Sequence, residues 1–255
     1  MTGAFFLNKN NDENKFEKKW FNLFKTFAEQ NDDDAGIAGW SKTGLETRIR
    51  YFIRYSKPSI SSENTLWVDI GCGAGTYSYL LTKYYKTVIG IDYSHVSIIK
   101  AKEKYNSDIM WIVANAKSLP INNNLIDGAL CFGVSQALSD VNPVIVDISR
   151  ILKSDGTLWI DALNKWFIPN LWQQVYRSMR GIPLHLRYDS PFQLISTLKN
   201  HGYCNIKIFY LPLLPKSLQW LNFIVESNIF NYLINLIAPF GLLFSHSFII
   251  KANLK

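Results

Sequence analysis

Cysteine and histidine are scarce in this chain, with three cysteines and four histidines among 255 residues. Cys72, Cys131 and Cys204 lie far apart in the sequence, without a C-x-x-C pair or another metal-ligand spacing. This pattern argues against a disulfide framework and a structural zinc site. Residues 1–10 also lack the basic start and long apolar core of a signal peptide. We therefore expect a cytoplasmic protein that binds no metal ion.

Acidic side chains are nearly missing from the last third of the chain. Residues 165–255 carry nine basic and two acidic side chains, whereas residues 58–164 carry eight and ten. The formal net charge of the whole chain is +7. The basic residues either keep an apolar segment soluble or favour an anionic partner, such as a phosphate-bearing lipid, an acidic glycan or nucleic acid.

An apolar run that ends in glycines is the most informative motif. The run is followed by Gly71, Gly73 and Gly75, and a helical pattern starts directly afterwards. This order predicts a buried strand that turns sharply into a helix and lets a ligand approach the backbone. A dinucleotide fingerprint would need a further glycine where this chain has Thr76. Asp69, just before the turn, disfavours a phosphate and favours a ligand with an ammonium and a sulfonium group.

A second acid follows where a nucleotide ribose would need it. Residues 87–92 form another apolar run, which ends in Asp92, 21 residues after Gly71. A carboxylate at this place can accept hydrogen bonds from both hydroxyls of a ribose. Alternatively, Asp92 caps the helix that follows Ser94.

Three further segments complete a pattern that resembles the class I S-adenosylmethionine-dependent methyltransferases, in their broad small-molecule and lipid-quinone branch. A third strand at 110–113 precedes Asn115, a fourth strand lies within 127–133, and residues 148–160 are similar to that family's helix, turn and fifth strand. The resemblance covers about 100 residues. Asn115 departs from the commoner Asp, although its amide can still bond an adenine edge. Residues 154–156 replace the usual Pro-Gly-Gly.

The resemblance implies S-adenosylmethionine as the cofactor and S-adenosylhomocysteine as its product. It also implies an α/β fold, a doubly wound seven-stranded mixed sheet of the Rossmann-like methyltransferase type. The positions that match the family's cofactor site are Asp69, Gly71, Cys72, Gly73, Gly75, Asp92, Tyr93, Asn115, Ala116, Phe132 and Gly133.

Strands that alternate with helical patterns indicate βαβ units and a parallel sheet independently of the resemblance. We expect a single domain in three parts. N-terminal cap helices occupy residues 1–57, the cofactor-binding core occupies 58–164, and an acceptor-side segment with the last two strands occupies 165–255.

The predicted cap has two amphipathic helices, over residues 13–30 and 42–55. In the family that the chain resembles, such helices commonly cover the cofactor crevice. Trp40 and Arg48 could then face the carboxylate of the cofactor, although ordinary surface positions are the simpler expectation.

An apolar insertion, residues 212–245, separates the last two predicted strands. Its hydrophobic residues recur at helical spacing, and Glu226 is the one charged residue from 217 to 250. The insertion is either a buried lid helix or a membrane-surface helix that inserts Trp220, Phe223 and Phe230. A spanning helix is a third alternative, but Asn residues and a Pro-Phe-Gly sequence interrupt it.

Methyl transfer from a sulfonium requires mainly positioning and the exclusion of water. A general base is needed only for a hydroxyl or an acidic carbon. His185 is the candidate base because it lies in the segment where similar proteins bind the acceptor, with a structural role as the alternative. Trp166 and Tyr188 of the same segment are candidate acceptor-pocket residues.

Missing motifs narrow the choice of acceptor. The chain has no Asn/Asp-Pro-Pro-Tyr sequence for amino-group methylation, no Pro-Cys pair for cytosine C5 and no magnesium-site spacing. We expect a small-molecule or amphiphilic natural-product acceptor, methylated at oxygen, with nitrogen and carbon left open. The alternatives are a membrane- or lipid-linked acceptor, with the protein peripheral at a membrane, and a non-catalytic cofactor-binding subunit. Nucleic acid is least expected, since 217–250 contains no basic residue.

Overall fold

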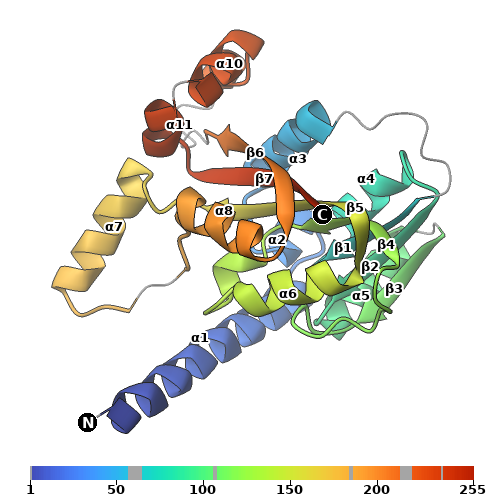
Figure 1. The fold of residues 1–255 in the computed structure, drawn as a ribbon, viewed down its shortest axis with the longest axis horizontal. Coiled ribbons are helices and arrows are strands. Elements are labelled where there is room, and N and C mark those ends of the chain that lie inside the picture. Colours follow the sequence, from blue (N-terminus) through green and yellow to red (C-terminus); the bar gives the residue numbers. More distant parts are fainter. Residues whose placement is uncertain (1, 57–64, 106–107, 184–185, 213–219, 237) are drawn as a thin grey trace.

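The computed structural model describes residues 2–56, 65–105, 108–183, 186–212, 220–236 and 238–255. Its centre is a seven-stranded sheet of order β3-β2-β1-β4-β5-β7-β6 (Figure 1). The strand β7 is antiparallel to β5 and β6, and the other pairs are parallel. The strands are β1 (Leu66–Ile70), β2 (Thr87–Asp92), β3 (Ile109–Val113), β4 (Ile126–Cys131), β5 (Leu152–Leu163), β6 (Tyr203–Leu211) and β7 (Ser247–Leu254). The predicted α/β fold with a mixed sheet is confirmed.

Different helices cover the two faces of the sheet. Successive strand residues point to opposite faces, so neighbouring residues of one strand belong to different cores. Val68 of β1 belongs to a core that includes α6 and α8, whereas Trp67 belongs to a core that includes α3 and α4. The helices up to β6 are α1 (Thr2–Gln30), α2 (Asp34–Ile37), α3 (Lys42–Ser56), α4 (Thr76–Thr82), α5 (His95–Lys104), α6 (Asn142–Ile151), α7 (Ile168–Met179) and α8 (Pro191–Asn200), with the short 3-10 helix η1 (Ser135–Ala137).

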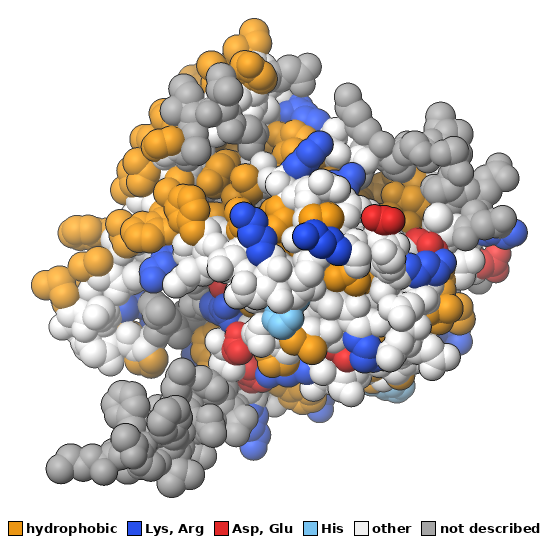
Figure 2. Space-filling model, viewed as in Figure 1, with side chains coloured by type: hydrophobic (Ala, Val, Ile, Leu, Met, Phe, Trp, Pro, Cys, Tyr) orange, Lys and Arg blue, Asp and Glu red, His pale blue; other side chains and the backbone are white. Residues whose placement is uncertain are grey.

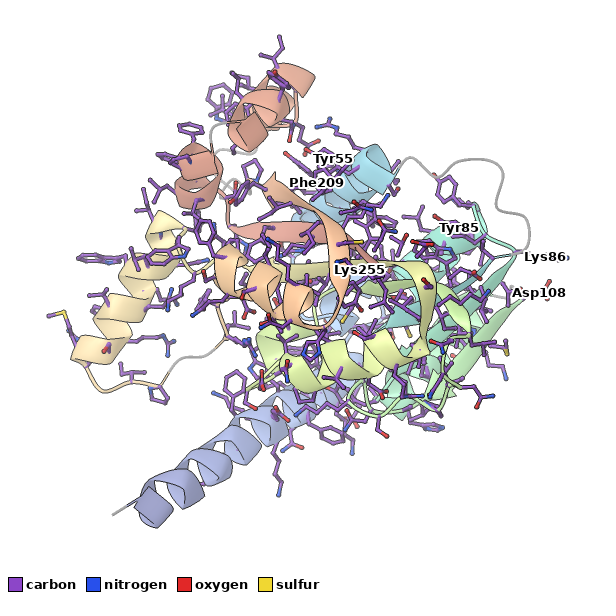
Figure 3. The ribbon with its side chains drawn as sticks, in the orientation of Figure 1. Tyr55, Tyr85, Lys86, Asp108, Phe209 and Lys255 are labelled. Atoms are coloured by element: carbon purple, nitrogen blue, oxygen red, sulfur yellow. The ribbon has the colours of Figure 1, made fainter. Side chains whose placement is uncertain are left out.

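The insertion between β6 and β7 is divided into α9 (Asn222–Val225), α10 (Asn228–Leu236) and α11 (Ala238–Phe244). It packs on α3 through polar contacts. Arg50 donates to both carboxylate oxygens of Glu226, at 2.9 and 2.7 Å. The hydroxyl of Tyr55 donates to the side-chain oxygen of Asn231 at 3.2 Å. Tyr55 also stacks on Phe209 of β6 with ring centroids 4.1 Å apart (Figure 3).

Two features differ from the sequence prediction. No helix was predicted between residues 161 and 189, yet residues 168–179 form a regular helix, α7. The single apolar stripe predicted for the insertion is split, because turns at residues 226 and 227 separate α9 from α10. In the part of the chain that the structure describes, no helix combines the length and apolarity needed to cross a bilayer.

Candidate cofactor and acceptor site

A cavity of about 330 Å³ lies at the carboxyl ends of the parallel strands. Residues that follow β1, β2, β3 and β4 form its floor, and side chains of α1 and α2 form its roof. Parallel sheets bind ligands at this edge, where the strands end in loops. Ten of the eleven predicted cofactor residues line the cavity: Asp69, Gly71, Cys72, Gly73, Asp92, Tyr93, Asn115, Ala116, Phe132 and Gly133.

The remaining residue, Gly75, has a packing role that the sequence prediction missed. A Cβ at Gly75 would lie 2.6 Å from the ring of Trp111, and a Cβ at Gly90 would lie 2.4 Å from the same ring. The two glycines therefore make room for Trp111. Gly73 differs, because a Cβ there would meet no atom within 4 Å. A ligand can therefore approach the backbone at Gly73. Gly75 instead lets Trp111 of β3 pack against the turn.

Asp92 fixes the shape of the site from the end of β2. Its two carboxylate oxygens accept hydrogen bonds from the backbone N–H groups of Gly73, at 2.9 Å, and Ser94, at 2.8 Å. Ser94, and not Asp92, caps helix α5, by accepting from the N–H of Ser97. A carboxylate has about four lone-pair sites, so Asp92 can still accept bonds from two ribose hydroxyls.

Asp69 brings a second buried carboxyl to the cavity, with only 2% of its surface exposed. It accepts a hydrogen bond from the hydroxyl of Ser78 at 2.7 Å. Burial raises the pKa of Asp69 to about 7, and the nearby charge of Asp92 acts in the same direction. Two buried carboxyls favour a cationic ligand, since its charge relieves their repulsion.

We expect the cofactor affinity of this protein to rise between about pH 6 and about pH 7.5. The raised pKa keeps Asp69 protonated in the free protein below about pH 7, and a cationic ligand must expel that proton. The folding stability of the free protein has the opposite pH dependence. Asp69 holds its proton more tightly in the folded state, so the stability that this proton confers is lost as the pH rises through the folded-state pKa of about 7. Calorimetry with S-adenosylhomocysteine, which keeps the ammonium group, measures the effect. The variant Asp69→Asn should bind with little pH dependence, and an equal dependence in both proteins would contradict the prediction.

Glu17 of α1 attaches the roof to the loops that follow β3 and η1, which form the rim of the cavity on this side. One carboxylate oxygen of Glu17 accepts from the N–H and the hydroxyl of Ser139, at 3.0 and 2.5 Å, and the other accepts from Lys117 at 2.5 Å. Partial burial raises the pKa of Glu17, but these hydrogen bonds outweigh it and lower the pKa below its usual value. The ring of Phe21 stacks on the ring of Tyr93, with the ring centroids 4.9 Å apart. These contacts close the cavity from the N-terminal side.

Asp34 attaches the other end of the roof. Its carboxylate accepts from the hydroxyls of Thr76, at 2.5 Å, and Tyr105, at 2.9 Å, and it also pairs with Lys104. The described residues of the insertion do not line the cavity. The interpretation of residues 212–245 as a lid is therefore wrong for those residues, because α1 and α2 occupy that place.

Beside Gly133, a buried ion pair supports the cavity wall. Arg48 of α3 donates to Asp161 of β5 at 3.4 Å, and each side chain is 5% exposed. The other oxygen of Asp161 accepts from the N–H of Gly133 at 2.7 Å. The Arg48 guanidinium lies 4.5 Å from the ring centroid of Trp40, which lines the cavity. A surface position for Arg48 was therefore the wrong expectation, since the folded chain brings it to Asp161.

Two tyrosines that line the cavity carry buried hydroxyls that sequence reasoning did not identify. Neither Tyr77 nor Tyr93 has a partner for its buried hydroxyl among the described residues. Burial raises both pKa values well above that of a free tyrosine, so each hydroxyl keeps its proton. No sequence pattern marks Tyr77, which follows the glycine turn like an ordinary helical residue.

The predicted acceptor residues lie outside this cavity. Trp166 donates its indole N–H to the hydroxyl of Ser190 at 3.4 Å, and Tyr188 donates its hydroxyl to Gln173 at 2.9 Å. Neither residue lines this cavity, and their role in an acceptor pocket stays a prediction. Trp166 lies just before α7, and Tyr188 contacts Gln173 in the middle of that helix. His185 lies outside the described residues.

Residues 68–160 match a family model described as a methyltransferase domain. The ubiquinone biosynthesis O-methyltransferase of Pelagibacter ubique is 28% identical over 60% of this chain and 67% of that protein. Malonyl-[acyl-carrier protein] O-methyltransferase of Hamiltonella defensa is 30% identical over 43% of each protein. An uncharacterized protein of Methanocaldococcus jannaschii is 29% identical over 45% of each. The chain thus spans about half the length of the curated relatives it matches.

Solved structures share the fold. A chain from the complex between the Haloferax volcanii Trm112 methyltransferase activator and a methyltransferase has a TM-score of 0.62 at 15% identity, covering 91% of this chain and 96% of that one. Haemonchus contortus phosphoethanolamine N-methyltransferase 2, with S-adenosylhomocysteine bound, has a TM-score of 0.58 at 18% identity, covering 82% and 52%. The chain carries a class I S-adenosylmethionine-dependent methyltransferase domain. Its cofactor is S-adenosylmethionine.

Proposed function

We propose that this protein methylates a small-molecule or amphiphilic natural-product acceptor at oxygen, with S-adenosylmethionine as the methyl donor. The observation that carries the proposal is the cavity, which joins the two buried carboxyls to an apolar wall formed by the roof. The names of the Pelagibacter and Hamiltonella relatives, both O-methyltransferases, support oxygen as the methylated atom. The Haemonchus enzyme is an N-methyltransferase, so nitrogen stays the first alternative.

Some residues of the cavity bind the cofactor, and others exclude water from it. When bound, the cofactor supplies an electrophilic methyl group with a neutral thioether as the leaving group. Asp92 accepts the ribose hydroxyls, and Asp69 offers a carboxylate to the cationic part. Trp20 and Phe24 of the roof, with Phe132 opposite, exclude water from the cavity. Excluding water and orienting the acceptor lower the barrier of a displacement that needs no covalent help from the protein.

Proton removal depends on the acceptor, so the sequence candidate His185 stays a proposal. A hydroxyl acceptor would need a base, whereas an ionised carboxylate would not. Tyr77, which keeps its proton, would donate a hydrogen bond to the acceptor rather than act as a base.

Replacing Asp92 by Ala should weaken cofactor binding by about 1.5–3 kcal/mol, or roughly tenfold to a hundredfold in Kd. The variant loses the ribose acceptor and also frees the N–H of Gly73, which Asp92 now holds. Calorimetry with S-adenosylhomocysteine measures the loss. Asp92→Asn is the matched control, because it keeps one acceptor oxygen and should lose less. Wild-type protein that gives no heat and no thermal stabilisation with this ligand would refute the proposed function.

Methyl transfer itself is tested with a panel of phenolic, carboxylate and amine acceptors and labelled S-adenosylmethionine. Transfer to a phenol or a carboxylate supports the proposal, and transfer to amines alone contradicts oxygen as the methylated atom. Cofactor binding without any transfer favours the second candidate, a non-catalytic cofactor-binding subunit. Preference for an acceptor presented in vesicles favours the membrane- or lipid-linked alternative, which the exposed apolar helices support.

A further inference from the structure

Helix α7 packs on the protein with its polar side and presents its apolar side outward. Its buried residue is Asn170, which donates to the carbonyl of Asn164 at 2.9 Å. Gln174, one turn further on, donates to the carbonyl of Lys165 at 3.1 Å. The opposite side carries apolar residues at helical spacing that are 37–83% exposed: Ile168, Leu171, Trp172, Val175, Tyr176 and Met179. A surface helix is normally stabilised by burying its apolar stripe, so this orientation indicates an external apolar partner.

The outward stripe of α7 continues onto the insertion. Asn164, just before α7, donates to the carbonyl of Leu242 in α11 at 2.6 Å, and the rings of Phe167 and His246 meet edge to face at 5.8 Å. Figure 2 shows hydrophobic side chains gathered over α7, α11 and α10, along the left and upper left of the view. The exposed members beyond α7 are Trp220, Ile229, Tyr232, Leu233, Phe240 and Phe244. We call the two sets together the apolar face.

The charged residues within and directly after helix α7, Arg177 and Arg180, are both basic. Helices α7, α10 and α11 contain no acidic residue. The two acids of the last third are both paired within the protein, Asp189 with Arg187 and Glu226 with Arg50, each at 2.7 Å. The exposed Arg180, at the end of α7, lies 4.8 Å from the ring centroid of Tyr176. Exposed aromatic side chains with basic neighbours are the composition of membrane-interface helices.

The shape of this region also favours a bilayer over a second copy of the chain. Helix α7 and the pair α10 and α11 project from the body of the protein as separate elements (Figure 1). A stable interface between two copies needs closely complementary surfaces. Separate projecting helices fit a fluid lipid surface, which adapts to them.

We propose that the apolar face docks on an anionic lipid bilayer, with Trp172, Met179, Trp220 and Ile229 entering the boundary between headgroups and acyl chains. Arg180, beside Tyr176 at the end of α7, attracts the anionic headgroups. This inference rests on the proposed function only where it concerns the methyl acceptor.

The apolar face is connected to the wall of the cavity. Helix α7 follows β5, and Arg187, beyond α7, donates its backbone N–H to the carbonyl of Gln136 in η1 at 3.1 Å. The next residue, Ala137, lines the cavity. Docking would therefore place the rim of the cavity close to the lipid, where an amphiphilic acceptor can enter without crossing water.

Flotation with vesicles of phosphatidylcholine, with and without phosphatidylglycerol, tests the docking without cofactor or acceptor. We expect the wild-type protein to float with the anionic vesicles and to bind less at high salt. Trp172→Ser/Met179→Ser should lower the partition constant by about tenfold or more. Met110→Ser/Leu125→Ser is the matched control, since these residues are 51% and 42% exposed outside the apolar face. The control should float like the wild type.

Folding of every variant is checked by its thermal transition and by calorimetry with S-adenosylhomocysteine, which separates docking from the proposed function. If the α7 variant does not fold, Trp172→Phe replaces it, and brominated acyl chains should quench its tryptophan fluorescence less than that of the wild type. Wild-type protein that binds no anionic vesicles at low salt would overturn the proposal. So would a wild-type dimer that the α7 variant converts to monomers, because a second copy would then cover the face.

Discussion

Replacing Arg48 by Met should lower the free energy of unfolding by about 3–5 kcal/mol, the cost of breaking a buried ion pair from one side. The substitution leaves the carboxyl of Asp161 buried without its cation, in a place where burial already raises its pKa. It also removes the guanidinium next to the ring of Trp40. Chemical denaturation of the two proteins measures the difference.

The double variant Arg48→Met/Asp161→Asn is the control for this prediction. The introduced asparagine would carry no charge, and its amide oxygen could still accept from the N–H of Gly133, which Asp161 now binds at 2.7 Å. We expect the double variant to recover a substantial part of the lost stability, because removing both charges leaves no unpaired buried charge. A double variant that is less stable than Arg48→Met would show that the ion pair does not account for the loss.

Replacing Gly75 by Ala should destabilise the protein by about 3 kcal/mol, which combines the strain of a left-handed backbone with the overpacking of a filled core. Gly75 has φ +83°, and its Cβ would meet the ring of Trp111 at 2.6 Å. The ring has no room to retreat, because Gly90 packs against it from the sheet. Thermal unfolding and denaturant titration both measure the effect.

Gly73→Ala provides the comparison. Gly73 also has a positive φ, +52°, but its Cβ would point into open space. The free energy of unfolding of this variant should fall only by the backbone cost, about 1–2 kcal/mol. Because Gly73 lines the cavity, we expect it to lose cofactor affinity as well. If Gly75→Ala were no less stable than Gly73→Ala, packing against Trp111 would not be the reason for the glycine.

The sequence alone predicted the sheet and brought together most of the residues that line one wall of the cavity, because both depend on local patterns. A buried parallel strand needs an apolar run, and the turn after it needs glycine, so both appear in consecutive residues. Asp92 could be placed for the same reason, at the end of such a run. The role of Gly75 could not be separated from that of Gly73, since both are glycines of one turn and differ only in what packs behind them.

Other parts depend on contacts between distant residues or on an unusual orientation. The partner of Arg48, Asp161, is 113 positions away, and no local pattern connects the two. Helix α7 was missed although its apolar residues recur at helical spacing, and no sequence pattern indicates that Asn170 and Gln174 face the protein. The acceptor residues Trp166 and Tyr188 stay predictions, since their side chains bond Ser190 and Gln173 and do not line the cavity.

The position of β7 constrains the order in which the sheet can form during synthesis. Strand β6 has β7 as its neighbour in the sheet, and β7 lies between β5 and β6 although it comes after both in the chain. While the ribosome still covers residues 247–254, β5 has an open edge and β6 has no place to pair. The edge of β5 therefore stays unpaired until β7 emerges, and unpaired strand edges make a partly folded chain prone to aggregation.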